Sequence, residues 1–167
     1  MRALGSLLAL LLAVLSAGAS AADEYRNRWE VEGWYGYDLF TNGVYQACNA
    51  VYEFGPSLAF RLTRIPELPA SSFELWDSTV GVDLSAIADL GASVTVTVGS
   101  TQRVYKVHDS ASMFVEIIPQ PDIVELLAAG GPASFKLPNG KVYSFRLPPA
   151  PTAMANYKKC MESNRVR

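Results

Sequence analysis

The sequence predicts a mainly β fold: an antiparallel sandwich or curled sheet with two short helices, the C-terminal one pinned by a disulfide to an early strand. Short runs of alternating apolar and polar residues recur along the chain, as they do in half-buried strands. Turn-forming pairs such as Asn-Gly and Gly-Pro separate several of these runs. Beyond the N-terminal segment, helical apolar spacing is confined to two short stretches, both after residue 120.

Side-chain alternation sets the limits of the expected strands. Residues 44–54 form the longest one, in which Cys48, Ala50, Tyr52 and Phe54 share a face because strand side chains alternate. Asn139-Gly140 favours a type I′ turn, so the last two strands should form a hairpin. The expected strands span residues 29–31, 44–54, 57–63, 73–76, 93–98, 103–108, 113–118, 134–138 and 141–147.

Both expected helices follow a residue that can cap an N-terminus. Asp122 precedes the first, residues 123–127, which the Gly130-Gly131 pair ends. Thr152 precedes the second, residues 153–162. Apolar residues at helical spacing on this last helix should pack on the sheet, and they lie beside Cys160.

The chain has two cysteines, Cys48 and Cys160, and we expect them to be bonded to each other. A redox pair would favour close spacing such as Cys-x-x-Cys, so this distant pair is predicted to be structural. The bond would close a loop of roughly 110 residues, for which chain-entropy arguments give about 4–5 kcal/mol of stabilisation.

Residues 1–22 have the organisation of a signal peptide. Arg2 supplies a positive start, an apolar run follows, and the small residues from Ala17 to Ala22 offer an Ala-x-Ala cleavage site. The apolar run is too short for a membrane anchor, which needs about 20 residues. Cleavage would leave residues 23–167 as one β-rich exported domain with no further transmembrane segment, and we expect a periplasmic or secreted location.

Composition excludes some classes of partner. The chain holds 14 Lys and Arg against 16 Asp and Glu, a net charge of −2. A weakly acidic chain with scattered bases lacks the basic patch of a nucleic-acid binder. A single histidine, with both cysteines expected in a disulfide, also predicts no metal site and no cofactor.

A set of local patterns resembles a known family. The Cys48–Tyr52 segment reads Cys-x-x-x-Tyr, valine-rich strands follow it, and the 137–147 segment precedes a helix with the second cysteine. Over residues 44–161 this arrangement resembles small exported proteins of alphaproteobacteria that are distantly similar to the invasion-associated locus B family. The resemblance implies a β-rich exported domain without known catalysis, in which Cys48 and Cys160 are structural.

No catalytic residue is predicted. The His108-Asp109-Ser110 run contains triad residue types, but triads are assembled from separate segments, so it is interpreted as the end of a surface hairpin. The Asp77-Ser78-Thr79 run lacks the glycine of an aspartic-protease loop. A glycosidase needs a specific pair of carboxylates, and nothing in the sequence distinguishes two of the many present.

The segment from Trp29 to Tyr45 is the candidate binding region. It holds six aromatic residues interleaved with glycines and with three acids, Glu30, Glu32 and Asp38. Since unpaired acids stay in water, they should keep part of the aromatic surface exposed. The predicted binding residues are Trp34, Tyr35, Tyr37 and Phe40. The alternative is that these aromatics only cover one end of the sheet.

These observations favour a non-enzymatic binding or accessory protein of the cell envelope. Its partner would be an envelope protein, a peptide or a glycan, because exposed aromatics with polar neighbours suit recognition of all three. The alternative is an envelope hydrolase with an unrecognised carboxylate site. Two carboxyl groups with raised pKa values in a pocket would favour the hydrolase, and an exposed aromatic surface would favour binding.

Overall fold

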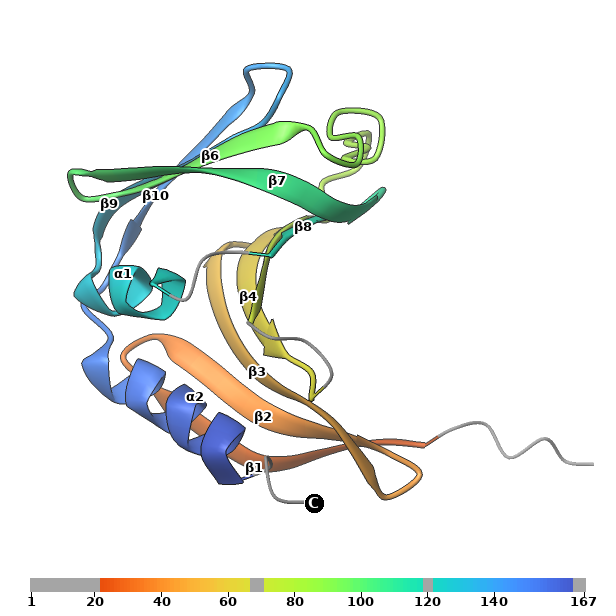
Figure 1. The fold of residues 1–167 in the computed structure, drawn as a ribbon, viewed down its shortest axis with the longest axis vertical. Helices are drawn as coiled ribbons and strands as arrows, with labels where there is room; N and C mark the ends of the chain where they lie inside the picture. Colours follow the sequence, from red (N-terminus) through yellow and green to blue (C-terminus); the bar gives the residue numbers. More distant parts are fainter. Residues whose placement is uncertain (1–21, 67–70, 119–121, 164–167) are drawn as a thin grey trace, which may run out of the picture.

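A single antiparallel sheet of ten strands dominates the fold (Figure 1). The computed structural model describes residues 22–66, 71–118 and 122–163. The strand order is β1-β2-β3-β4-β5-β8-β7-β6-β9-β10, and two helices complete the described chain. The elements are β1 (Asp23–Val31), β2 (Trp34–Thr41), β3 (Val44–Gly55), β4 (Leu58–Arg64), β5 (Ser72–Asp77), β6 (Ser93–Val98), β7 (Thr101–Ala111), β8 (Phe114–Ile117), α1 (Ile123–Ala129), β9 (Gly131–Lys136), β10 (Val142–Leu147) and α2 (Pro151–Ser163).

The sheet curls at β7, which pairs with different strands along its length. Residues 101–106 of β7 pair with β6, and the remainder pairs with β8. The register with β8 shifts between Val107 and Asp109, and such a bulge lets a strand bend and change partner. The exposed His108 lies at this bulge.

The curl brings the last strand across from the middle of the sheet. The Phe145 ring of β10 lies 4.3 Å from the Phe60 ring and 4.6 Å from the Phe54 ring, centroid to centroid. The Tyr52 hydroxyl donates to the Arg146 carbonyl at 3.1 Å. These contacts enclose a core of aliphatic and aromatic residues, and the predicted curled antiparallel sheet with two short helices is confirmed.

Most expected strands form, but β2 was not predicted as one. Glu32 and Gly33 take positive φ values of 57° and 77°, and Asn42 and Gly43 take 53° and 77°. Both pairs therefore make two-residue hairpin turns of type I′, one on each side of β2. Asn-Gly in a sequence predicts such a turn, because Asn adopts positive φ more readily than most residues with a Cβ. Glu does not share this preference, so Glu-Gly predicts the turn only weakly.

The predicted hairpin at Asn139 forms with a longer loop. Its ladder ends at the Val142–Lys136 pair, and the Leu137 N–H donates to the Lys141 carbonyl at 2.8 Å. The Gly140 N–H donates to the Leu137 carbonyl, and only Gly140 takes a positive φ. Pro138 sits second in this turn, where its fixed φ suits type I, so the expected type I′ turn is wrong.

Both helices form, but neither is capped as predicted. The side chain of Asp122 makes no cap and instead accepts from Arg103 Nε at 3.3 Å. Helix α2 begins at Pro151, which places Thr152 inside it. The carboxylate of Glu32, in the β1–β2 turn, accepts from the backbone N–H groups of Thr152 and Ala153 at 2.9 and 3.0 Å. This long-range cap lowers the pKa of Glu32, chiefly through the Ala153 N–H.

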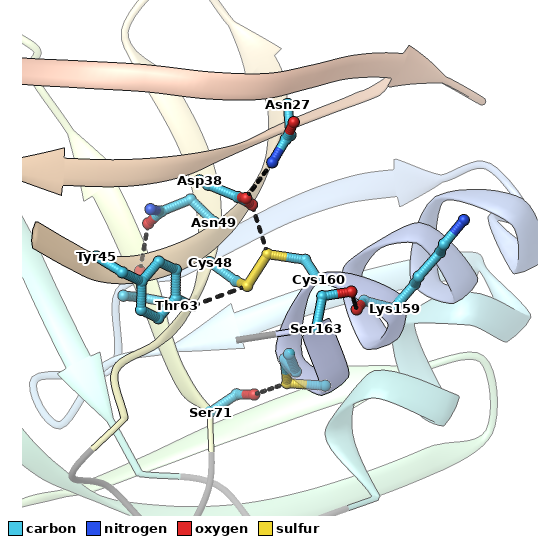
Figure 2. Close-up of a disulfide and its surroundings, with 11 residues drawn as sticks. Asn27, Asp38, Tyr45, Cys48, Asn49, Thr63, Ser71, Lys159, Cys160 and Ser163 are labelled. Atoms are coloured by element: carbon cyan, nitrogen blue, oxygen red, sulfur yellow. Dashed lines mark hydrogen bonds between the residues drawn. A yellow bond between two sulfur atoms is a disulfide. The ribbon is translucent and has the colours of Figure 1, made fainter. Parts of the chain in front are cut away.

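The predicted disulfide between Cys48 and Cys160 is confirmed, with Cα atoms 6.1 Å apart (Figure 2). It joins α2 to β3, and Ala153, Met154 and Tyr157 of α2 are buried beside it. A stable disulfide indicates an oxidising compartment. The expected signal peptide lies, except for Ala22, outside the described residues. Across residues 22–66, 71–118 and 122–163, no helix has the length and apolarity to cross a bilayer.

Candidate functional site

Strand β2 divides the four predicted binding residues between its two faces. Trp34 is fully buried and Phe40 is only 8% exposed, so the expectation that they contribute to an exposed surface is wrong. Tyr35 is 37% exposed and Tyr37 is partly exposed, and both point to the other side of the sheet. Trp34 pairs with Tyr52 of β3, which places it on the core face.

The buried face of β2 accommodates an acid because that acid is partnered. Asp38 is 5% exposed, and its Oδ2 accepts from Asn27 Nδ2 at 2.6 Å (Figure 2). Its other oxygen lies 2.7 Å from Cys160 Sγ. We expected the acids to keep this face exposed to water, and this expectation is wrong for Asp38. Asn27 of β1 supplies a hydrogen-bond donor that the sequence pattern does not reveal, so Asp38 can be buried.

The opposite face of the sheet, which we call the outer face, points away from the core and the helices. The strand registers align three rows of side chains across it, and Tyr35, Tyr37 and Trp76 each lie in a different row. The rows are Tyr35–Val51–Arg61–Glu74–Glu116, Tyr37–Asn49–Thr63–Ser72 and Glu53–Ala59–Trp76–Phe114.

Two adjoining grooves lie on this face and share Tyr35 and Tyr37 as a common wall. The larger, about 620 Å³, lies over β1 and β2. The smaller, about 290 Å³, lies over β2 to β5 and the turn between β3 and β4. The larger groove is lined by Tyr25, Arg28, Trp29, Glu30, Tyr35, Gly36 and Tyr37, and the smaller includes Val51, Glu53, Ser57, Ala59, Arg61, Trp76 and Ser78.

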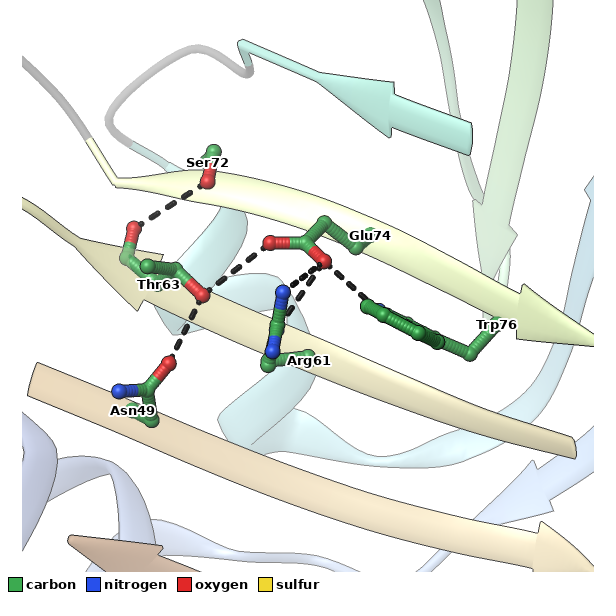
Figure 3. A network of polar contacts seen from close by, with 6 residues as sticks. All are labelled: Asn49, Arg61, Thr63, Ser72, Glu74 and Trp76. Atoms are coloured by element: carbon green, nitrogen blue, oxygen red, sulfur yellow. Dashed lines mark hydrogen bonds and ion pairs between the residues drawn. The ribbon is translucent and has the colours of Figure 1, made fainter. Parts of the chain in front are cut away.

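A buried carboxylate fixes the floor of the smaller groove (Figure 3). Glu74 is only 4% exposed, and its Oε2 accepts from Arg61 Nη2 and from Trp76 Nε1, both at 2.6 Å. The Thr63 hydroxyl lies within hydrogen-bonding distance of Glu74 Oε1 (3.2 Å) and of Asn49 Oδ1 (3.0 Å). Arg61 Cζ also lies 4.7 Å from the centre of the Trp76 ring. Because Glu74 is paired and hydrogen-bonded, it can be buried and hold both side chains in place.

The hydroxyl groups of the two tyrosines in the common wall stay protonated and uncharged at neutral pH. Burial, aided by a hydrogen bond to Glu53, raises the pKa of Tyr35 to about 12, and its hydroxyl donates to Glu53 Oε1 at 3.0 Å. Burial also raises the pKa of Tyr37. The Tyr37 ring meets the Tyr25 ring edge to face at 5.0 Å. At neutral pH both rings offer an apolar surface and an uncharged hydroxyl.

Three residue groups that suggest chemistry have structural explanations. Asp38, Cys48 and Cys160 place potential metal ligands within 4.8 Å of one another, but the disulfide occupies both sulfurs. Buried Asp77 accepts from the Tyr143 hydroxyl at 2.7 Å and from Lys141 Nζ at 3.4 Å, which ties β10 to β5. Of the His108-Asp109-Ser110 run, His108 and Asp109 are exposed, and the Asp109 carboxylate accepts from the Ser110 backbone N–H.

Sequence reasoning missed Tyr25, Arg61, Glu74 and Trp76 as members of the site. Alternation in residues 58–63 places Arg61 on the face opposite the apolar residues, and this pattern alone could have identified Arg61 as a candidate site residue. Trp76 joins the site only because β4 and β5 lie beside β3, which the sequence does not state.

Comparison of the chain with protein-family models, with curated proteins and with solved structures finds no match in any of the three. The resemblance to the invasion-associated locus B proteins therefore stays a prediction, and the case for function rests on the geometry of the outer face.

Proposed function

We propose that the chain is an exported, non-enzymatic binding protein of the cell envelope, and that it binds its partner on the outer face of β1 to β5. One observation supports this most strongly: two adjoining grooves meet at the partly exposed rings of Tyr35 and Tyr37. Aromatic side chains give a partner a large contact area at low entropy cost. Tyr25, 47% exposed, extends this surface to the edge of the sheet.

Export to the periplasm or to the medium is the second part of the proposal. The signal-peptide pattern of residues 1–22 supports it, and so does the Cys48–Cys160 bond, which persists in an oxidising compartment. N-terminal sequencing of the soluble secreted protein should begin at Ala22 or Asp23. Soluble protein that retains Met1 would contradict export by cleavage.

The carboxyl groups support binding over hydrolysis. A hydrolase with a carboxyl general acid needs one whose pKa is raised. Among the described residues, every carboxyl group with a clearly shifted pKa is shifted downward: Glu32, Asp77, Asp83 and Glu125. Glu74, beneath the groove, already accepts from Arg61 and Trp76.

A capture experiment tests the proposed function. The mature protein, a Tyr35→Ala variant and a Tyr35→Ala/Tyr37→Ala variant are immobilised and exposed to cell-envelope extract. Val104→Ala and Val142→Ala serve as controls, because Val104 and Val142 are 61% and 50% exposed on β7 and β10, outside both grooves.

We expect one envelope component to be retained by the wild type and both controls, and to be lost from the tyrosine variants. Melting temperatures separate loss of binding from loss of structure, and the single variant guards against unfolding of the double one. Equal capture by wild type and Tyr35→Ala would contradict the proposal, and so would capture that the valine controls abolish.

A further inference from the structure

We infer that the ligand of the two grooves is a neutral glycan, an inference that rests on the proposed binding function. Four aromatic rings on the outer face line the grooves, and the common wall presents two of them side by side on β2. These residues are Tyr25, Tyr35, Tyr37 and Trp76. A pyranose ring has an apolar C–H face and a rim of hydroxyls, and an aromatic ring with polar neighbours complements both.

The spacing of the positions that carry the two tyrosines suits a chain of sugars. Tyr35 and Tyr37 are two residues apart on one strand, so their attachment points are about 6.7 Å apart. This is comparable to the length of one pyranose unit with its linkage. The two grooves continue on either side of this pair, so an extended oligosaccharide could contact both.

The grooves carry charges of both signs, which disfavours a strongly charged ligand. The grooves contain two arginines, Arg28 and Arg61, and two glutamates, Glu30 and Glu53. Arg61 is already paired with Glu74, and Glu53 accepts from Tyr35. A nucleic acid or another polyanion would need a surface of a single positive sign.

The sheet also offers no free backbone to an extended peptide in the smaller groove. Peptides that bind by strand addition pair with the edge of a sheet. The smaller groove lies over β2 to β5, each of which already pairs with a strand on both sides, and only the larger groove reaches an edge strand, β1. A strand-like peptide would therefore gain no main-chain hydrogen bonds from the floor of the smaller groove.

A proline-rich peptide is the remaining rival, since such peptides dock in aromatic grooves. Polyproline has carbonyl acceptors but no N–H donors. It could accept from Arg61, but it would cover the exposed Glu53 without donating to it. Sugar hydroxyls both donate and accept, so a glycan can satisfy Glu53 and Arg61 together.

Titration calorimetry of the mature chain tests this inference. The probes are neutral hexasaccharides, namely β-1,4-linked glucose, β-1,4-linked N-acetylglucosamine, α-1,4-linked glucose and α-1,6-linked mannose, with decaproline as the peptide arm. We expect at least one hexasaccharide to bind with a Kd below about 1 mM, and Tyr35→Ala to weaken that binding at least about tenfold. Val104→Ala should change it less than twofold.

Two outcomes would overturn the inference in different ways. Binding of decaproline that depends on Tyr35, or Tyr35-dependent capture from envelope extract, without binding of any hexasaccharide would refute the glycan and leave the proposed binding function standing. Absence of Tyr35-dependent binding to every probe and to the extract would refute both.

Discussion

Removal of the disulfide should cost much of the stability of the fold. The bond between Cys48 and Cys160 spans 112 residues. A loop of this length removes unfolded-chain entropy worth about 4–5 kcal/mol at 25 °C. Because domains are typically stable by only about 5–15 kcal/mol, the Cys48→Ala/Cys160→Ala variant should lose about a quarter or more of its free energy of unfolding.

Equilibrium urea unfolding followed by circular dichroism measures this loss. The buried residues Met154 and Tyr157 should keep α2 docked in the variant, so the native spectrum should be retained. Wild-type protein treated with dithiothreitol is the matched control and should unfold at the same urea concentration as the variant. A loss below about 1 kcal/mol would refute the reasoning, because it would mean that the unfolded chain gains little freedom when the bond is absent.

Three further predictions concern the two faces of β2 and the titrating groups. Trp34→Ala should cost about 3–5 kcal/mol in urea unfolding because it empties a fully buried site, whereas Tyr35→Ala should cost less than about 1 kcal/mol, and the reverse order would contradict the assignment of faces. Glu32→Gln should lower the melting temperature at neutral pH but not at acidic pH. The pKa of Glu32 is lower in the folded chain than its value of 4.5 in the unfolded chain, so the ionised carboxylate stabilises the fold above pH 4.5, and this contribution is lost as pH falls through the folded pKa. Equal losses of melting temperature at pH 3 and pH 7 would refute the role of Glu32 as the cap of α2. Burial raises the pKa values of Tyr35 and Tyr45 to about 12, so the unfolded chain releases these protons near pH 10 and the folded chain releases them only at higher pH. The free energy of unfolding should therefore fall from pH 10 to pH 12, and a free energy that does not change over this range would contradict the prediction.

Much of the sheet follows from local patterns in the sequence. Alternation predicted β3 and β4, and an isolated pair of cysteines in a chain expected to be exported predicted the disulfide. The sequence does not reveal β2 as a strand, because its buried face includes Gly36 and Asp38, residues that are rare in strands. Asp38 is tolerated there because Asn27, held at a φ of 49° where β1 bulges, reaches it from the edge of the sheet.

Only part of the candidate site could be predicted from the sequence, because the rest depends on contacts between distant segments. The density of aromatics drew attention to β2, but the side on which each ring lies depends on where the β1–β2 turn falls. Gly36 shows this dependence: a Cβ there would lie 2.2 Å from an atom of the Trp29 ring, which packs directly on its backbone. The contribution of Arg61 and Trp76 depends on strand order, which is set by the fold as a whole.

The most direct test of a binding surface on the outer face is hydroxyl-radical footprinting of the mature chain with and without envelope extract, at matched radical dose. Tyr25, Tyr35, Tyr37 and Trp76 should lose labelling when extract is present, because a bound partner would cover the grooves that they line. Met113 is 48% exposed beyond the grooves and should label equally in both samples. Unchanged labelling of the four aromatics, or protection of Met113 alone, would contradict the account.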